Sequence, residues 1–192
     1  RMKLRLVSLF SGYDSQALAM ARLKRDFPDF DYELVAWCEI DKMAIHVHNA
    51  LFPQWADRNL GDICNVNPED VPDCDCLTYS FPCQDISNAG MQKGFAQGSG
   101  SRSSLLWECE KIIKAKQPQY LVMENVKALT QKKFMPEFQR WIDTLSEYGY
   151  TSFWQVLNSK DFGCPQNRER VFMVSILGNA AFEFPRPFPL EK

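Results

Sequence analysis

The chain has 192 residues, of which 45% are hydrophobic and 24% are charged, and its formal net charge is −2 at pH 7. This composition is typical of a soluble globular protein with one well-buried core, and it excludes a strongly basic protein whose whole surface binds nucleic acid. The apolar runs have the length of strands, and none resembles a signal peptide or a membrane span. Seven cysteines, an odd number, argue against a disulfide framework and favour a reducing cytoplasm.

The first half of the chain alternates short apolar runs with segments of helical periodicity. Helices are predicted over residues 16–24 and 42–51, and strands over residues 4–10, 32–39, 59–63 and 77–81. A turn separates the first strand from the first helix, and Asp14 or Ser15 is expected to cap that helix.

The stretch over residues 79–87 joins a strand end to a long polar segment. Pro82 ends the apolar run because proline cannot donate to a sheet ladder, and Cys83 follows at once. Residues 85–104 are polar and rich in Gly and Ser, and we expect the loop over residues 84–104 to be mobile without DNA. A thiol at a strand end beneath such a loop predicts a nucleophile beneath a lid, and a buried structural cysteine is the alternative.

The second half continues the alternation and then changes it. Helices are predicted over residues 105–116 and 134–148, and strands over residues 120–123, 151–157 and 171–177. Pro118 closes the first of these helices, and Gly149 is a natural C-terminal cap for the second.

This order of elements predicts the fold class. Alternating strands and helices indicate an α/β fold with a doubly wound, mostly parallel Rossmann-like sheet. The last two strands have no helix between them and therefore predict an antiparallel edge hairpin. The proline-rich tail, residues 179–192, is expected to be a linker after one domain over residues 1–178.

The cysteine and histidine spacings do not predict a metal site. Cys74 and Cys76 have one residue between them, and no second cysteine pair at ligand spacing follows. His46 and His48 lie two apart on a predicted helix, where side chains do not share a face, so we interpret both as ordinary helix residues.

Polar residues follow the ends of successive predicted strands. In an open parallel sheet, ligands bind outside these carboxyl ends, where a carboxylate after the second strand commonly takes ribose hydroxyls. A second carboxylate could accept from an exocyclic amine such as adenine N6. Solvated or helix-capping carboxylates are the alternative for any one position, but five positions in one register favour a site. These positions are Gly12, Glu39, Asp62, Cys83 and Glu124.

The first turn constrains the kind of cofactor. It carries a single glycine, Gly12, where a dinucleotide-binding fingerprint has three. A nicotinamide or flavin dinucleotide is therefore a poor fit, and a nucleoside without a pyrophosphate fits better. S-adenosylmethionine is the common example of such a ligand.

Taken in chain order, the motifs resemble those of the catalytic domain of DNA (cytosine-5)-methyltransferases, and they cover almost the whole chain. Any one of them alone would be weak, but the nucleophile, glutamate and paired-arginine motifs in this order are specific. The resemblance implies a Rossmann-like methyltransferase fold. The matching stretches are Leu9-Phe10-Ser11-Gly12, Glu39-Ile40, Gly61-Asp62-Ile63, Ser80-Phe81-Pro82-Cys83-Gln84, Glu124-Asn125-Val126 and Gln166-Asn167-Arg168-Glu169-Arg170.

The resemblance implies a cofactor site for S-adenosylmethionine, with S-adenosylhomocysteine as the product. Phe10 is similar to a residue that stacks on adenine, and Glu39 to the ribose ligand. Ile40 would lie beside the adenine, and the motif that follows would contact the adenine edge. The residues implied for this site are Phe10, Gly12, Glu39, Ile40, Asp62, Ile63 and Pro82.

The implied reaction is methyl transfer to C5 of cytosine through a covalent adduct. Cys83 attacks C6, Glu124 protonates or hydrogen-bonds N3, and Arg168 lies at O2. Arg170 completes the paired-arginine motif near the base and the catalytic loop. The implied substrate is double-stranded DNA with its target cytosine flipped out of the duplex, and residues 84–102 would close over that base.

The chain departs from the family pattern at three points. Asp14 stands where the family usually has a second glycine. The target-recognition domain and the last cofactor motif, which come after the paired arginines, are both missing. We therefore expect a second chain or a missing C-terminal region to supply target recognition. Residues 1–178 would be the catalytic domain and residues 179–192 a linker toward that region, and this part alone could be inactive.

Two alternatives stay open beside the leading interpretation. A tRNA cytosine-5 methyltransferase of the same family would keep the chemistry and change the substrate. A non-catalytic subunit of a split enzyme would keep only the binding of S-adenosylmethionine. The leading interpretation is a DNA-methylating enzyme of the restriction–modification kind, in the cytoplasm of a bacterial or phage-infected cell.

Overall fold

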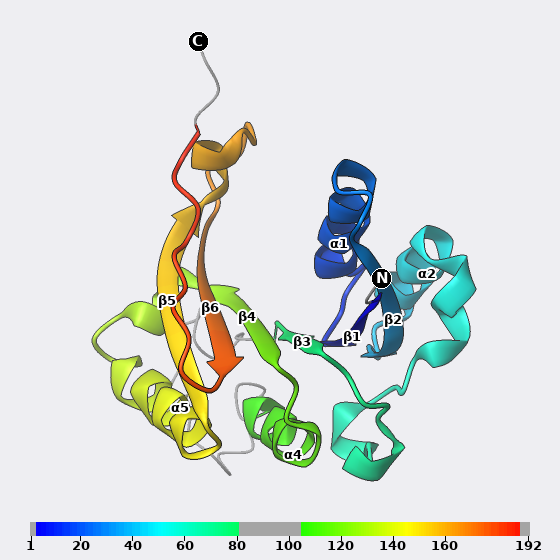
Figure 1. The fold of residues 1–192 in the computed structure, drawn as a ribbon, viewed down its shortest axis with the longest axis horizontal. Helices are drawn as coiled ribbons and strands as arrows, with labels where there is room; N and C mark the ends of the chain where they lie inside the picture. Colours follow the sequence, from blue (N-terminus) through cyan, green and yellow to red (C-terminus); the bar gives the residue numbers. More distant parts are fainter. Residues whose placement is uncertain (1–2, 81–104, 189–192) are drawn as a thin grey trace. The chain divides into compact units, whose positions relative to one another are not determined.

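The computed structural model describes residues 3–80 and 105–188, and these fall into two compact units (Figure 1). The first unit contains residues 3–80 and 105–121, and the second contains residues 122–188. Pro82, Cys83 and the polar stretch that we expect to be mobile lie outside the described residues.

The first unit is built on three parallel strands. They are β1 (Lys3–Leu9), β2 (Asp31–Cys38) and β3 (Cys76–Tyr79), in the order β2-β1-β3. All four residues of β3 and the last four of β1 are buried, as expected for parallel strands that are covered on both faces. This unit also contains the helices α1 (Ser15–Asp26), α2 (Lys42–Leu51) and α4 (Leu106–Lys116), and the 3₁₀ helices η1 (Pro53–Arg58), η2 (Ile63–Asn65) and η3 (Pro68–Asp70).

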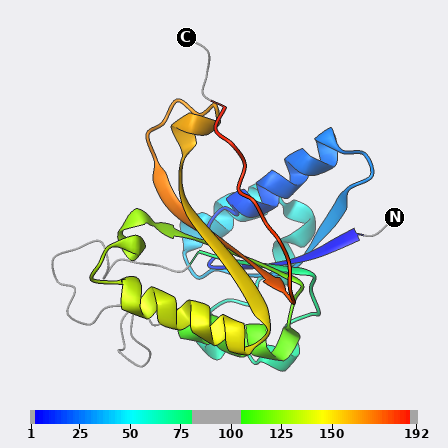
Figure 2. The same ribbon diagram turned by 60° about the vertical axis from the view of Figure 1, so that its left-hand side comes forward.

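The second unit is a mixed group of strands with one long helix. The strands β4 (Tyr120–Val126), β5 (Tyr150–Asn158) and β6 (Glu169–Leu177) lie in the order β4-β6-β5. Helix α5 (Met135–Glu147) lies along β5 and buries Phe138, Trp141 and Leu145 (Figure 2). Two 3₁₀ helices, η5 (Lys127–Thr130) and η6 (Ser159–Phe162), complete the unit.

The predicted edge hairpin is confirmed. β5 and β6 are antiparallel from the pair Tyr150–Leu177 to the pair Asn158–Glu169. The predicted helices are also present, within a few residues at each end. Asp14 caps α1 through its side chain, which accepts from the Ala17 N–H.

The strand predicted over residues 59–63 is wrong. Asn59 forms only an isolated parallel bridge with Trp37. Gly61 then turns the chain with φ +79°, a conformation that glycine adopts without strain, and η2 follows. Because pairing stops after one bridge and the backbone turns at Gly61, these residues do not form a strand.

The fifth predicted strand is longer than expected. β4 continues through Glu124 and Asn125, which we had placed after its end. Burial alternates along this strand, so that Met123 and Asn125 are buried while Glu124 lies on the less buried face. A strand with one accessible face can include a carboxylate, and an apolar run therefore underestimates its length.

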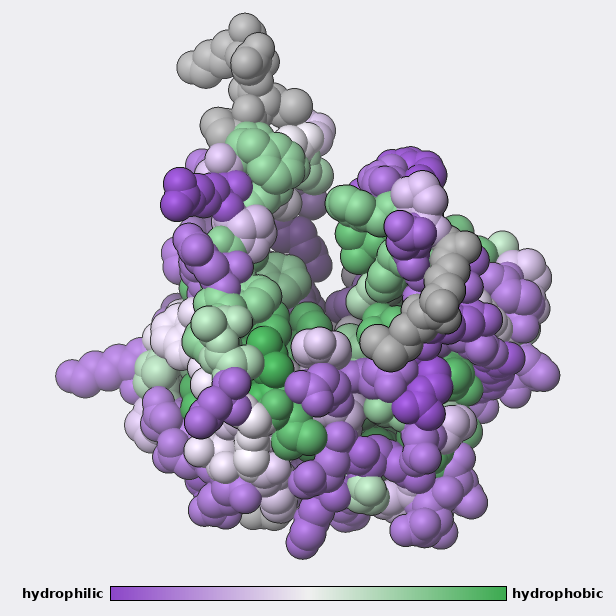
Figure 3. All heavy atoms as spheres, viewed as in Figure 1, coloured by the Kyte–Doolittle hydropathy of each residue, from purple (hydrophilic) through white to green (hydrophobic). Residues whose placement is uncertain are grey.

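The proline-rich tail packs against the hairpin as far as it is described. Residues 179–188 form neither helix nor strand, as predicted. The ring of Phe182 lies 6.0 Å from that of Phe153, and the ring of Phe188 lies 5.5 Å from that of Phe162. Figure 3 shows hydrophobic atoms gathered along this hairpin. The function of the tail as a linker stays a prediction.

No helix within residues 3–80 and 105–188 is long and apolar enough to cross a membrane.

Near the N-terminal end of β1, Arg5 and Asp75 form an ion pair with three hydrogen bonds. The Asp75 carboxylate accepts from the backbone N–H, Nε and Nη2 of Arg5 at 2.8, 3.1 and 2.8 Å. This pair joins β1 to the residue that precedes β3.

Asp75→Asn is expected to lower the free energy of unfolding by about 1 kcal/mol near neutral pH, the upper range for a partly exposed pair. The hydrogen bonds from Arg5 hold the pKa of Asp75 below its usual value. The stabilisation is therefore present above the unfolded-state pKa of about 4 and is lost as the pH falls through the lower folded-state pKa. Urea unfolding at neutral and at strongly acidic pH measures both limits.

Asp70→Asn, at an exposed position of η3, makes the same change of charge and serves as the control. It should change the stability by less than about 0.5 kcal/mol. A loss for Asp75→Asn that is equally large at both pH values would contradict the electrostatic assignment.

Candidate active site

The carboxylate of Glu39 joins the ends of β1 and β2. Its Oε2 accepts from the backbone N–H of Gly12 at 2.8 Å. Its Oε1 accepts from the backbone N–H groups of Ile40 and Asp41, both at 2.9 Å. Neighbouring parallel strands end at the same edge of a sheet, which brings these segments together. Glu39 is thus fixed in orientation and keeps lone pairs that can accept from a ligand hydroxyl.

Asn59 holds the backbone of Glu39 in place. Its Oδ1 accepts from the Glu39 N–H at 3.2 Å, and its Nδ2 donates to the Glu39 carbonyl at 3.0 Å. The same Oδ1 also accepts from the Gly61 N–H at 2.9 Å. The side chain of Asn59 therefore does for Glu39 what a neighbouring strand would do. Sequence reasoning missed this residue, and no motif in the sequence marks it.

The loop after β1 has an unusual backbone. Phe10, Gly12 and Asp14 have φ values of 53°, 55° and 70°, so that alternate residues are left-handed. A Cβ added to Gly12 would meet no atom of residues 3–80 and 105–188 within 4 Å, so these residues leave the space beside this glycine open. The glycine is needed here for its backbone conformation rather than for close packing.

The structure brings four of the predicted cofactor residues together at this edge of the first unit. They are Phe10, Gly12, Glu39 and Ile40. The side chain of Ile40 is 67% exposed, which leaves an apolar surface directly beside the fixed carboxylate. An apolar surface next to an acceptor of hydroxyl hydrogen bonds suits a nucleoside better than it suits a phosphate.

The two predicted adenine-edge residues follow the bridge at Asn59. Asp62 caps η2, where its Oδ1 accepts from the Cys64 N–H at 2.9 Å. Ile63 is only 5% exposed, so its side chain belongs mainly to the core. Contact between Ile63 and a ligand would therefore involve its backbone or one edge of its side chain.

Gln16 connects α1 to the end of β3. Its Nε2 donates to Oγ of Ser80 at 3.0 Å. Ser80 is the last described residue before the segment that contains the predicted nucleophile Cys83. Gln16 is a second residue that sequence reasoning missed.

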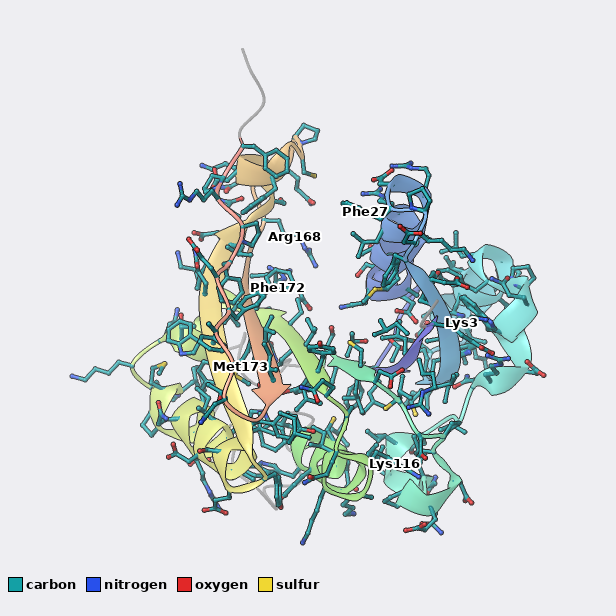
Figure 4. The ribbon with its side chains drawn as sticks, in the orientation of Figure 1. Lys3, Phe27, Lys116, Arg168, Phe172 and Met173 are labelled. Carbon is teal, nitrogen blue, oxygen red and sulfur yellow. The ribbon has the colours of Figure 1, made fainter. Side chains whose placement is uncertain are left out.

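The second unit carries the predicted glutamate and paired arginines. Nε of Arg170 lies 3.2 Å from Oε1 of Glu124, and about a quarter of each side chain is exposed (25% and 22%). Arg168 is exposed, and its backbone N–H donates to Oδ1 of Asn158 at 3.1 Å. Figure 4 shows Arg168 and Phe172 on the same side of β6, opposite the buried Met173. Glu124 is thus paired with Arg170 rather than with Arg168.

Five of the six described cysteines are poor candidates for a nucleophile. Burial raises the pKa of Cys38, Cys74 and Cys76 to about 12. Burial also raises the pKa of Cys109 well above its ordinary value, and that of Cys64 to a smaller extent. These five thiols stay protonated near neutral pH, and a thiol is a weak nucleophile.

Among the described residues, no group of His, Cys, Asp and Glu side chains gathers in a way that could hold a metal ion. A carboxylate directly after β2, such as Glu39, and a single-glycine first loop are features typical of Rossmann-like proteins that bind nucleoside cofactors. The model of the family described as C-5 cytosine-specific DNA methylase matches residues 4–190. The chain belongs to this family.

Several known proteins are similar to this chain. The type II methyltransferase M2.ScrFI of Lactococcus lactis subsp. cremoris is 55% identical over 131 residues, which are 68% of this chain and 36% of that protein. The type II methyltransferase M.HaeII of Haemophilus aegyptius is 38% identical over 181 residues, 94% of this chain and 53% of that protein. The chain thus spans between about a third and about half the length of these two curated relatives.

Solved structures confirm the fold class. The methyltransferase EhMeth of Entamoeba histolytica matches all of this chain and 58% of its own length, with a TM-score of 0.78 at 16% identity. The Dnmt2 methyltransferase of S. pombe matches 95% of this chain and 52% of its own length, with a TM-score of 0.68 at 19% identity. The family resemblance is confirmed, and the roles of the individual site residues stay predictions.

Asn59→Ala is expected to lower the free energy of unfolding by about 1–3 kcal/mol, because it leaves partly buried backbone groups without partners. Amide exchange should speed up at Glu39 and Gly61, whose N–H groups lose their acceptor. Denaturant unfolding and residue-resolved hydrogen exchange measure the two effects.

Asn67→Ala is the matched control, because the side chain of Asn67 accepts a single hydrogen bond, from the exposed backbone N–H of Glu69. It should cost about 0.5–1 kcal/mol and leave exchange at Glu39 unchanged. Unchanged exchange at Glu39 in Asn59→Ala would show that the side chain does not hold this strand end.

Proposed function

We propose that this chain is the cofactor-binding and catalytic part of a DNA (cytosine-5)-methyltransferase. It would transfer a methyl group from S-adenosylmethionine to C5 of cytosine. The observation that carries the proposal is the carboxylate of Glu39, fixed by three backbone N–H groups beside the exposed Ile40, in a chain of the C-5 cytosine-specific DNA methylase family. Whole relatives are longer, so the activity proposed is that of the complete protein.

The residues at the edge of the first unit fit the cofactor. Glu39 would accept from the ribose hydroxyls, and Phe10 and Ile40 would contact the adenine. Asp62 would accept from the adenine amine, and Gly12, with open space beside it, would allow the ligand to approach the backbone. Ile63 and Pro82 would complete the site. When bound, S-adenosylmethionine supplies an electrophilic methyl group on a sulfonium.

Cys83 would supply the nucleophile. Cytosine C5 is a poor nucleophile, and attack of the Cys83 thiolate on C6 makes C5 enamine-like. After C5 is methylated, a base removes the C5 proton, the bond between C6 and sulfur breaks, and the thiolate leaves. The raised pKa values of five other cysteines support this assignment by leaving few competing thiols.

Glu124 and the two arginines would stabilise the charge that develops in the ring. Glu124 would protonate or hydrogen-bond N3, and Arg168 would donate to O2. The ion pair with Arg170 supports this proposal, because it fixes the orientation of the Glu124 carboxylate before the base arrives. Arg170 would then position Glu124, while the exposed side chain of Arg168 is available to the substrate.

The substrate proposed is double-stranded DNA with a flipped cytosine, because the reacting atoms cannot be reached inside the stack. Target recognition would come from a second chain or from a region beyond this one. Relatives include the orphan methyltransferase M.Rho11sI of Bacillus phage rho11s, which is 36% identical over 174 residues. A bacterial cytoplasm, in a cell with or without a phage, is the proposed location.

Glu39→Ala is expected to weaken the binding of S-adenosylhomocysteine by about 1.5–3 kcal/mol, the range for a hydrogen bond to a charged group. Titration calorimetry on the full-length protein measures this change. Glu33→Ala is the matched control, because Glu33 lies on β2, the strand that leads to Glu39, and pairs with Lys3 and Arg58. Equal affinity in Glu39→Ala and in the wild type would reject the ribose assignment.

A duplex that contains 5-fluorocytosine should trap Cys83 in the full-length protein. Fluorine cannot leave C5 as a proton does, so the adduct between sulfur and C6 should persist after methyl transfer. Cys83→Ser should abolish the adduct, since a hydroxyl is far less ionised than a thiol near neutral pH. Intact mass spectrometry of the protein–DNA complex detects the adduct.

Cys164→Ser changes an exposed cysteine and should leave the trap intact. Glu124→Gln should slow formation of the adduct by about 10²-fold or more, while cofactor binding is largely kept. An adduct that forms in Cys83→Ser would overturn the mechanism. An adduct with tRNA but not with DNA would support the alternative substrate.

A further inference from the structure

The loop over residues 10–14 carries more backbone strain than its single glycine can relieve. Phe10 and Asp14 are both left-handed, with φ values of 53° and 70°. A left-handed residue other than glycine costs roughly 1–2 kcal/mol, and Asp tolerates this conformation better than Phe does. The surroundings of the loop must therefore hold it in place.

Asp14 is held from three sides and is fully buried. Its Oδ1 accepts from Oγ of Ser8 at 3.0 Å and from the Ala17 N–H at 3.1 Å. Its Oδ2 lies 3.2 Å from Nε2 of His48. Oγ of Ser8 in turn accepts from Oγ1 of Thr78 at 3.2 Å. A buried chain of polar groups thus runs from β3 through β1 to the loop and on to α2.

The other end of this chain is an unusual histidine. His48 is fully buried on α2, and its ring stacks on that of Trp37 at 3.6 Å with an interplanar angle of 15°. A carboxylate only accepts hydrogen bonds, so Nε2 of His48 carries the hydrogen of this contact. Nδ1 has no partner within the described part of the chain. The bond to Asp14 is therefore the one that fixes this ring by a polar contact.

The pair of Asp14 and His48 joins the same two segments that the carboxylate of Glu39 joins. Asp14 belongs to the loop that contains Gly12, and His48 belongs to the helix that begins two residues after Ile40. The bond from the Gly12 N–H to Glu39 joins these segments near the surface, and the pair joins them inside the core. Movement at the inner contact would change the geometry at the outer one.

We propose that Asp14 and His48 are positioning residues for the cofactor site. Their buried contact holds the loop over residues 10–14 in the conformation that presents the Gly12 N–H to Glu39. Asp14 thus fixes the loop by a side-chain contact rather than leaving its backbone free. The proposal rests on the proposed function for the identity of the ligand, while the loop conformation can be measured without any ligand.

Two variants of His48 separate the hydrogen bond from packing. His48→Phe keeps an aromatic ring on Trp37 and removes the donor to Asp14. His48→Gln loses the ring and keeps an amide nitrogen that can donate. In the cofactor-free full-length protein, hydrogen exchange of the Gly12 amide should rise about tenfold or more in His48→Phe and stay near the wild-type rate in His48→Gln.

Calorimetry with S-adenosylhomocysteine should give the same ranking. The dissociation constant should rise about tenfold in His48→Phe and less than about threefold in His48→Gln. Asp75→Asn is the matched control for stability, because its pair with Arg5 lies at the opposite end of β1. It should lower the melting temperature and leave both the exchange rate and the affinity unchanged.

The outcomes distinguish this proposal from the proposed function. A wild-type protein that does not bind S-adenosylhomocysteine would contradict the proposed function, and the exchange ranking would still decide this proposal. If the Gly12 amide of His48→Phe exchanges at the wild-type rate, or if exchange rises equally in both variants, the positioning role of Asp14 and His48 is overturned. If His48→Phe does not fold, Ser8→Ala removes the other side-chain donor to Asp14 and must raise exchange in the same loop. No change there would also overturn the proposal.

Discussion

The hydrogen bonds to the carboxylate of Glu39 are the interaction on which the rest of the site depends. They come from two segments, the loop after β1 and the start of α2, and each donor is a backbone N–H of Gly12, Ile40 or Asp41. A carboxylate offers about four lone-pair sites, so three such bonds orient it without using all of them. The site thus carries an oriented negative charge that suits ribose hydroxyls and repels phosphate. This agrees with a first loop that carries one glycine.

The two units hold their polar groups in different surroundings, buried in the first unit and partly exposed in the second. In the first unit, strained backbone and a buried chain of hydroxyl, carboxylate and imidazole groups fix a loop. The hydrogen bonds among these groups matter because an unpaired polar group in the core costs more than a missing apolar contact. In the second unit, Glu124 and Arg170 lie on the less buried face of two strands, where water lowers the cost of the charges. A group that must meet a substrate fits that partly exposed position.

The antiparallel hairpin was predicted because no helical segment separates its two apolar runs. Periodicity in the sequence was enough to predict helices such as α5, whose buried residues Phe138, Trp141 and Leu145 follow helical spacing. It failed at residues 59–63, where the side chain of Asn59 pairs with the backbone of Glu39 twenty residues away. Long-range contacts of this kind leave no periodic trace. The contacts of His48 with Asp14 and Trp37 were not predicted for the same reason, since they come from other elements rather than from spacing along its own helix. The family was predicted correctly because its motifs stand in the sequence itself and do not depend on packing.

The central claim is that the ends of β1 and β2, joined through Glu39, form the binding site of a nucleoside cofactor. Titration of ¹⁵N-labelled full-length protein with S-adenosylhomocysteine, followed through the backbone amide resonances, tests it most directly. The account predicts that the amides of Gly12, Ile40 and Asp41 shift together and saturate at one dissociation constant. Saturable shifts confined to other parts of the chain, with these three amides unchanged, would contradict it.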